Sequence, residues 1–237
     1  CDGENLTSEK TELVLSEILS GEVDPSQISA FLIALKVKGE TTEEIIGLVR
    51  AMLNASEPLS LPENSIDIVG TGGSLQRREA ALNVSTMASF VAAASGAVVC
   101  KHGNRRASST SGAFDLLDAL GLPLDQTPMQ VAEQVKSKNL GFAFAKTFHP
   151  AMRFAGPVRA GIGVPTVFNI LGPLSHPGRI KRHLIGTVNS ELAKQMAEVL
   201  LENGSKHAWI VTGETGIDEI SVTGTTNIVE LKDGKIS

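Results

Sequence analysis

Hydrophobic positions in the first sixty residues recur every three or four residues, which is the spacing of one buried face on a helix. Three helices are predicted, because this pattern is interrupted by start and stop signals. The second helix starts after Asp24, with Pro25 at its first position. The third starts at Thr41 and Glu44, a residue pair typical of a capping box. The chain therefore opens with a small helical domain, which we assign to residues 1–62.

The pattern changes from Ile66 onward, where short apolar runs alternate with longer segments of helical character. Strand-like runs are residues 66–69, 97–100, 142–145, 208–211 and 222–231, and helical candidates are residues 85–94, 111–120, 128–138 and 191–202. This alternation predicts an α/β domain with a mostly parallel central sheet over residues 63–237. A segment near residues 151–180 is expected to pack with the helical domain. Because no helix closes the last strand-like run, we expect the C-terminal part of the α/β domain to be missing from this sequence.

Composition limits the function before any motif is considered. The net charge of −5 provides no general attraction to nucleic acid or to anionic lipid, so neither partner is expected. Cys1 and Cys100 lie far apart without the spaced ligands of a zinc site, and a cytoplasmic location is the simpler interpretation. The longest apolar stretches are too short to span a bilayer.

Four segments place small or polar residues between a strand-like run and a helix, where open α/β sheets bind ligands. The first is the glycine-rich turn GTGG at residues 70–73, whose backbone amides suit a pyrophosphate. The second is NVST at residues 83–86, where a helix N-terminus suits a phosphate group. Taken singly, each is equally compatible with an ordinary turn or an ordinary helix cap. We expect all four segments to meet at one crevice.

The third segment, residues 101–109 (KHGNRRASS), places three cations and two serine hydroxyls in an otherwise acidic protein. Such a composition suits a ligand with several phosphates, although a solvated basic loop is the alternative. The fourth is the acid pair Asp218 and Glu219, which could hold Mg²⁺ through carboxylate oxygens. Paired acids are often merely solvated, but a pyrophosphate leaving group needs its charge neutralised.

In order along the chain, these segments resemble the signatures of the anthranilate phosphoribosyltransferase family. The matching segments are DIVGTGG (67–73), NVST (83–86), KHGN (101–104) with Ser108 and Ser109, HPAM (149–152), PVR (157–159), TVFNILGP (166–173) and DEI (218–220). The resemblance covers nearly the whole chain, and its KHGN and FNxLGP segments are the most specific. It implies a helical domain, a larger α/β domain, an active site between them and a homodimer joined through the helical domains.

The resemblance also implies site residues, position by position. Phosphoribosyl pyrophosphate would be held by Gly70, Gly72, Gly73, Asn83, Ser85, Thr86, Lys101, Ser108 and Ser109. Anthranilate would contact Gly70, Asn104 and Arg159, with His102 either lining its channel or packed as a structural histidine. Two Mg²⁺ ions would be bound by Ser85, Asp218 and Glu219.

The reaction implied is transfer of the phosphoribosyl group to the amine of anthranilate, giving N-(5-phosphoribosyl)anthranilate and pyrophosphate. This is the second step of tryptophan biosynthesis from chorismate. We expect an oxocarbenium-like ribosyl cation and inversion at the anomeric carbon, with positioning by Lys101 and Arg159 rather than acid–base catalysis.

One loop departs from the family pattern. Residues 74–82 (SLQRREAAL) are about three residues longer than usual, and Ala81 stands where the family has Thr. The exact phosphate contacts of this loop are therefore left open: Arg77 or Arg78 could replace them by charge, or the change could mark a related subgroup with an altered acceptor.

Two other functions remain open at this point. A pyrimidine nucleoside phosphorylase has a related fold, but it has no pyrophosphate that needs metal, so the acid pair disfavours it. A non-catalytic relative could bind nucleic acid through Lys101, Arg105 and Arg106, although the acidic total disfavours this function too.

Overall fold

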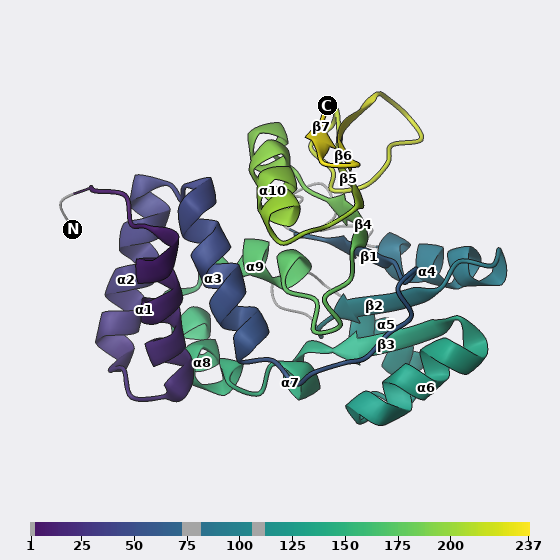
Figure 1. Ribbon diagram of the computed structural model, residues 1–237, viewed down its shortest axis with the longest axis horizontal. Helices are drawn as coiled ribbons and strands as arrows, with labels where there is room; N and C mark the ends of the chain where they lie inside the picture. The colour runs from purple at the N-terminus through teal and green to yellow at the C-terminus, as the bar shows by residue number, and fades with distance from the viewer. Residues whose placement is uncertain (1–2, 73–81, 106–111) are drawn as a thin grey trace.

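The computed structural model describes residues 3–72, 82–105 and 112–237 and shows a helical bundle beside an α/β domain (Figure 1). Its helices are α1 (Ser8–Ser20), α2 (Pro25–Lys38), α3 (Thr42–Asn54), α4 (Val84–Ala94), α5 (Ala113–Ala119), α6 (Pro128–Lys138), α7 (Ala145–Phe148), α8 (Met152–Ile162), α9 (Phe168–Leu174) and α10 (Ser190–Glu202). Its strands are β1 (Asp67–Gly70), β2 (Val99–Gly103), β3 (Leu140–Phe144), β4 (Arg182–Gly186), β5 (His207–Gly213), β6 (Thr226–Lys232) and β7 (Lys235–Ile236). Among the described residues, no helix combines the length and apolar character needed to cross a membrane.

The first three helices begin at the capping residues that the sequence supplies. Asp24 accepts a hydrogen bond from the backbone N–H of Ser26, with Pro25 in the first turn of α2. Thr41 and Glu44 form the predicted capping box at the start of α3. Each cap satisfies backbone donors that the helix itself leaves unpaired, which confirms the local prediction for these helices.

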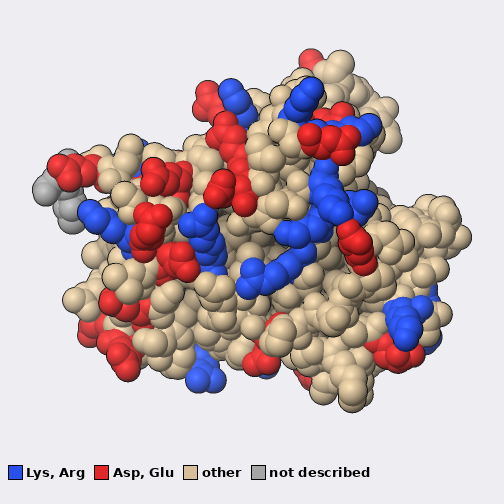
Figure 2. Space-filling view, in the orientation of Figure 1, with Lys and Arg blue, Asp and Glu red and all other residues tan. Residues whose placement is uncertain are grey.

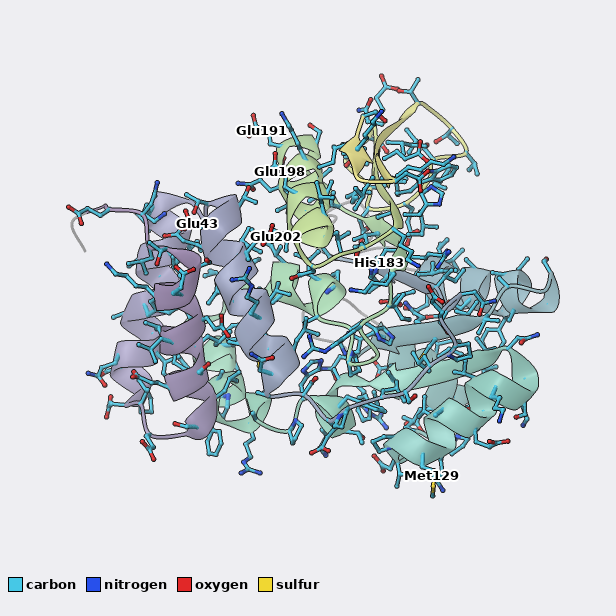
Figure 3. The ribbon with its side chains drawn as sticks, viewed as in Figure 1. Glu43, Met129, His183, Glu191, Glu198 and Glu202 are labelled. Atoms are coloured by element: carbon cyan, nitrogen blue, oxygen red, sulfur yellow. The ribbon has the colours of Figure 1, made fainter. Side chains whose placement is uncertain are left out.

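A fourth helix from the middle of the chain completes the bundle. Helix α8 packs against α1 and α2, where the ring of Phe154 lies against Gly21. The bundle meets the α/β domain along α3 and α10, where Thr42 donates a hydrogen bond to Glu198 (2.7 Å) and Arg50 pairs with Glu202 (3.1 Å). Figure 3 shows both glutamates projecting from α10 toward the bundle. Helix α8, which follows residue 151, therefore packs in the bundle, whereas α10 packs on the sheet of the α/β domain. The domain boundary at residue 62 stays a prediction.

The central sheet is mixed, in the order β1-β4-β5-β6-β7. Strands β1, β4 and β5 are parallel, whereas β6 and β7 add to the edge in antiparallel orientation. Strands β2 and β3 form a separate parallel pair. The predicted parallel arrangement therefore holds for the strands that carry candidate site residues, and the antiparallel edge was not predicted.

Strand β2 follows β1 for a short distance and then separates from it. Ile66 donates to the carbonyl of Val98 and accepts from Cys100, and Ile66 and Val99 form an isolated parallel bridge. Beyond that point the two strands are joined by side chains, which are described below.

Helices cover the sheet on both faces. Helix α10 packs on β5 and β6, and Leu171, Met196 and Ile210 lie in one buried cluster that continues into the helical bundle. Helix α6 covers β3 on the same side as Cys100 and Ala143, while Phe90 of α4 packs with Phe142 on the opposite side. These helices cover the faces of the strands, whereas ligands of such sheets bind at the carboxyl ends of the strands.

Candidate active site

Four neighbouring strands end in glycine at the same edge of the sheet. Strands β1, β2, β4 and β5 finish at Gly70, Gly103, Gly186 and Gly213. Because these strands run parallel, their carboxyl ends and the loops that follow come together. The predicted meeting of the first, third and fourth candidate loops is therefore seen in the structure.

A cleft of about 550 Å³ opens at this edge, between the strand ends and helices α8 and α9. The four residues predicted to contact anthranilate all line it: Gly70, His102, Asn104 and Arg159. The other walls are mainly apolar and include Met52, Val69, Met152, Phe168 and Pro173. A mainly apolar cleft with a few convergent polar groups is typical of a small-molecule site.

Arg159 brings a positive charge to this cleft from helix α8. Its guanidinium carbon lies 4.8 Å from the centre of the Phe168 ring, a cation–π contact that fixes the plane of the side chain. Burial lowers the pKa of Arg159, yet a guanidinium stays charged at any physiological pH. The arrangement therefore offers a pre-oriented planar donor group to a carboxylate.

His102 reaches the cleft as a neutral imidazole. Its Nδ1 lies 3.2 Å from the carbonyl oxygen of Gly172, so Nδ1 carries the proton and Nε2 is left as an acceptor. Burial, with His149 and His176 close by, holds the pKa of His102 well below its ordinary value. Nε2 is buried without a hydrogen-bond partner among the described residues. His102 thus packs in a histidine cluster and also lines the cleft, and its part in the acceptor channel stays a prediction.

The first residue of the acid pair, Asp218, packs against the glycine-rich turn at Gly70 and Gly72. The Asp218 carboxylate accepts the backbone N–H of Gly72 at 3.1 Å, and a methyl group added at Gly70 would sit 2.7 Å from the same oxygen. The Asp218 main chain rests directly on Gly186. These contacts place a buried carboxylate beside the turn, because Gly70 and Gly186 leave room for it. No group of three or more His, Cys, Asp or Glu is arranged for a metal in the described part of the chain, so a metal here would need water or substrate oxygens as well.

Lys101 does not line the cleft. Its side chain is buried, 2% exposed, and Nζ donates a 2.6 Å hydrogen bond to the carbonyl oxygen of Ile68 in β1. Burial lowers the pKa of Lys101, while the negative charges of Asp67 and Glu219 oppose that shift. The ammonium group therefore lies beneath the glycine-rich turn, near the acid pair, and not in the open cleft.

Helix α4 begins at the second predicted segment. Asn83 is its N-cap residue but makes no side-chain capping hydrogen bond. Thr86 is fully buried, and its Oγ1 has no partner among the described residues. The carbonyl oxygen of Ser85 accepts from the Ser89 hydroxyl, so its role in the helix is ordinary. None of these residues lines the cleft described above.

The basic loop is less available to a ligand than its composition suggests. Arg105 pairs with Asp118 at 2.9 Å and lies 3.8 Å from Asp115, so its charge is directed to helix α5 and away from the cleft. Two acids three residues apart on α5 therefore compensate Arg105, one of the three cations of this loop. The predicted residues Gly73, Ser108 and Ser109, the longer loop with Arg77 and Arg78, and Arg106 lie outside the described residues.

Comparison with known proteins gives the family. The chain matches the family model for the helical bundle domain of the glycosyl transferase family over residues 1–56, and the model for its a/b domain over residues 62–237. It is 45% identical over 235 residues to the anthranilate phosphoribosyltransferase of Rhodopseudomonas palustris (strain TIE-1), with 99% of this chain and 69% of that protein covered.

The chain belongs to the anthranilate phosphoribosyltransferase family.

Other members agree with this assignment in sequence and in structure. The enzyme of Agrobacterium fabrum is 46% identical over 99% of this chain and 68% of its own length. The crystal structure of the anthranilate phosphoribosyltransferase from Thermus thermophilus superposes with a TM-score of 0.89 at 44% identity, over 96% of this chain and 68% of that one. The Saccharomyces cerevisiae enzyme in complex with PRPP and Mg gives a TM-score of 0.85 at 33% identity, over 96% and 68%.

Sequence reasoning gave no role to several residues that shape the site. His149, Met152 and Phe168 line the cleft, although they were noted only as parts of family motifs. Asp67 is fully buried at the start of β1 and accepts the backbone N–H of His102. An acid at the start of an otherwise apolar strand was the signal that could have identified it.

Proposed function

We propose that this protein transfers the phosphoribosyl group of phosphoribosyl pyrophosphate to the amine of anthranilate, the second step of tryptophan biosynthesis from chorismate. One observation carries the proposal most directly. One cleft is lined by residues from three parts of the chain, namely Gly70, His102 with Asn104, and Arg159. The glycine-rich turn beside this cleft donates a hydrogen bond to Asp218 of the acid pair.

The cleft suits anthranilate as the acceptor. The apolar walls match an aromatic ring, and Arg159, held against Phe168, offers two parallel donors to the carboxylate. His102 lines the cleft as a neutral imidazole, so it adds no second positive charge beside Arg159. The yeast relative has been solved in complex with 4-fluoroanthranilate, which supports an aromatic acceptor for the family fold.

The glycine-rich turn suits the pyrophosphate donor. Gly70 and Gly72 allow close approach of the backbone, and the helix α4 N-terminus, with Asn83, Ser85 and Thr86, would contribute further donors. Lys101 would contribute charge from beneath the turn. Gly73, Ser108 and Ser109 complete the proposed donor set from the resemblance alone.

Magnesium fits the residues that are present. Asp218 and Glu219 are consecutive acids, and Asp218 is held in place by Gly72, so hard oxygen ligands are available next to the turn. We propose two ions, held by Ser85, Asp218 and Glu219. Bound magnesium would neutralise the charge of the pyrophosphate and make it a better leaving group.

The protein's own groups act mainly by positioning. The bond from the anomeric carbon to the pyrophosphate oxygen breaks, the bond from that carbon to the anthranilate nitrogen forms, and the nitrogen loses a proton. Arg159 and His102 orient the acceptor, while Asn104, at the exposed end of β2, borders the path between the two substrates. Holding both substrates in the reactive arrangement lowers the activation free energy more than any single acid or base would.

The alternative functions receive less support. A nucleoside phosphorylase has no use for the buried carboxylate on the turn. A nucleic-acid-binding relative would need a continuous basic surface, yet Figure 2 shows a short band of cations with acidic residues beside it, and Arg105 is compensated by Asp118.

We also propose a homodimer through the helical domains and a cytoplasmic location. Exposed apolar side chains on the bundle support the first proposal, with Val37 82% and Leu13 59% exposed. Sedimentation velocity over a range of concentrations tests it, since a monomer at all concentrations would contradict it.

The reaction is tested by following the loss of anthranilate fluorescence in the full-length protein, with phosphoribosyl pyrophosphate and with or without Mg²⁺. Consumption that requires the metal, and that falls at least about 100-fold in the Asp218→Asn/Glu219→Gln variant, is the expected result. An Asp125→Asn/Glu133→Gln variant removes the same charges from positions outside the site and serves as the matched control.

If the folded protein consumes no anthranilate, the proposed reaction is wrong. Phosphorolysis of a pyrimidine nucleoside in a parallel assay would then favour the phosphorylase, and DNA binding with a steep salt dependence would favour the nucleic-acid relative. Activity without metal would contradict only the magnesium site.

A further inference from the structure

The gap between β1 and β2 is bridged by two side chains. After the bridge at Ile66 and Val99, a parallel ladder would continue with the N–H of His102 donating to the carbonyl of Ile68. Instead, that N–H donates to the Asp67 carboxylate at 3.1 Å, and the Ile68 carbonyl accepts from the Lys101 ammonium at 2.6 Å. A carboxylate and an ammonium group thus replace one backbone hydrogen bond, at the point where the strands diverge toward the cleft.

Asp67 is a costly residue in this position. It is fully buried, its Oδ1 accepts from His102, and its Oδ2 has no hydrogen-bond partner among the described residues. Burial raises the pKa of Asp67 to about 7, although the Lys101 charge and the N–H of His102 oppose the shift. An amide or a hydroxyl could make the same hydrogen bond without this cost, so the carboxylate's charge needs its own explanation.

That explanation is provided by Lys101. Its ammonium group is also buried, and the charges that act on it are Asp67 from β1 and Glu219 from the loop after β5. The register partner of Lys101 in β3 is Phe142, and helix α4 has no ionisable side chain. Burial, with the charge of Asp67 adding to it, raises the pKa of the Cys100 thiol, and burial lowers the pKa of His183, the register partner of Asp67, so both neighbours are neutral. Of the two negative charges that act on Lys101, Asp67 is therefore the one that lies outside the proposed metal site.

We propose that Asp67 is a positioning residue, which keeps the buried Lys101 charged and holds its ammonium group under the glycine-rich turn. Through its bond to His102 it also sets the distance between the ends of β1 and β2, and so the width of the turn above them. The inference rests on the proposed function in one respect: Lys101 acts on phosphoribosyl pyrophosphate. Asp67 itself touches no substrate.

The Asp67→Asn variant tests the inference, because asparagine keeps the acceptor for His102 and removes the charge. Lys101 then loses its proton more readily, so the alkaline limb of kcat/KM for phosphoribosyl pyrophosphate moves to lower pH by about one unit. On the alkaline side of that limb the KM for phosphoribosyl pyrophosphate rises by up to about tenfold over wild type at the same pH, while kcat changes less than about twofold. Asp125→Asn, the same substitution at a site outside the cleft, leaves both unchanged.

A measurement independent of activity uses NMR of ¹³C-lysine-labelled wild-type protein. The side-chain signal of Lys101, assigned by its absence in Lys101→Arg, should show its own titration and a second inflection near pH 7 as Asp67 ionises. This experiment remains informative if Asp67→Asn fails to fold. A protein that consumes no anthranilate but shows the coupled titration would contradict the proposed reaction and support the Asp67–Lys101 pair. An active enzyme would overturn the inference if its Asp67→Asn variant kept the wild-type alkaline limb and KM, or if Lys101 lacked the inflection near pH 7.

Discussion

Gly186 is the position where a single methyl group should affect both stability and metal binding. It is buried at the end of β4, and an added Cβ would overlap the backbone oxygen of Asp218 and lie 2.6 Å from its carbonyl carbon. Non-bonded carbon atoms prefer a separation of about 3.5–4.0 Å, so the Asp218 main chain must move by about 1 Å. The backbone of Gly186 does not have a positive φ, so Gly186→Ala has a steric cost and no conformational one.

The cost of Gly186→Ala follows from two effects. Overpacking against a backbone atom costs about 1–3 kcal/mol, and loss of the hydrogen bond from Gly72 to the Asp218 carboxylate costs about 1–2 kcal/mol more. A total of about 3 kcal/mol corresponds to a fall in Tm of roughly 6–12 °C for a chain of this size. Because the carboxylate moves away from the turn, the Mg²⁺ concentration for half-maximal activity should rise about tenfold or more.

Two companion variants make this prediction specific. In Gly70→Ala the methyl group meets the Asp218 carboxylate oxygen, which can rotate away. The Mg²⁺ concentration for half-maximal activity should therefore rise, while the Tm should fall less than in Gly186→Ala. In Gly161→Ala, near the end of α8, nothing lies within 4 Å and the Tm should stay equal or rise. Differential scanning calorimetry and magnesium titration provide the measurements. A Gly186→Ala protein with a Tm within about 2 °C of wild type and unchanged metal dependence would refute the packing argument.

Three further predictions concern stability. Leu171→Ala, at a fully buried site between the bundle and α10, should cost about 3 kcal/mol in urea unfolding, whereas Met129→Ala at a 79% exposed site should change it by less than about 0.5 kcal/mol. Gly47→Ala should detach α1 from α3, because the methyl group would overlap the Ser8 carbonyl oxygen; faster amide exchange throughout α1 is the readout, and unchanged exchange would contradict it. Burial lowers the pKa of His183 to about 4, so the neutral form is favoured in the folded state; its contribution is complete above pH 6.5 and is lost as the pH falls toward 4, by about 3 kcal/mol. Urea unfolding at pH 7 and pH 4.5 should therefore show a smaller difference in His183→Asn than in wild type.

The elements predicted best from the sequence are those with local signals. Helix α6 occupies residues 128–138 as expected, because Thr127 and Pro128 mark its start and its apolar positions have one period. Strand β4 was missed, since Leu184 and Ile185 are its only strongly apolar residues and its stability comes from pairing with β1 and β5. Helices α8 and α9 were missed because Pro157 and Pro173 lie inside them.

The sequence predicted which residues take part in the site better than it predicted where their side chains point. The family resemblance assigned Arg159 and Asn104 to the acceptor, and both line the cleft. The sequence could not reveal that Lys101 points beneath the turn and Arg105 toward α5, because strand alternation and distant acids decide those directions. Asp67 was overlooked for the same reason, as its partner lies across a gap between two strands.

The late arrival of α8 in the helical bundle has a consequence for biosynthesis. Helices α1, α2 and α3 are complete at residue 54, but their fourth neighbour starts at Met152. At ribosomal speeds the bundle must wait about 5–20 seconds for it, with the face that receives Phe154 open to water or to a chaperone. The central sheet forms later still, because β1 pairs with β4, which is synthesised after α8. Translation pauses before residue 152 should therefore increase misfolding of both parts together.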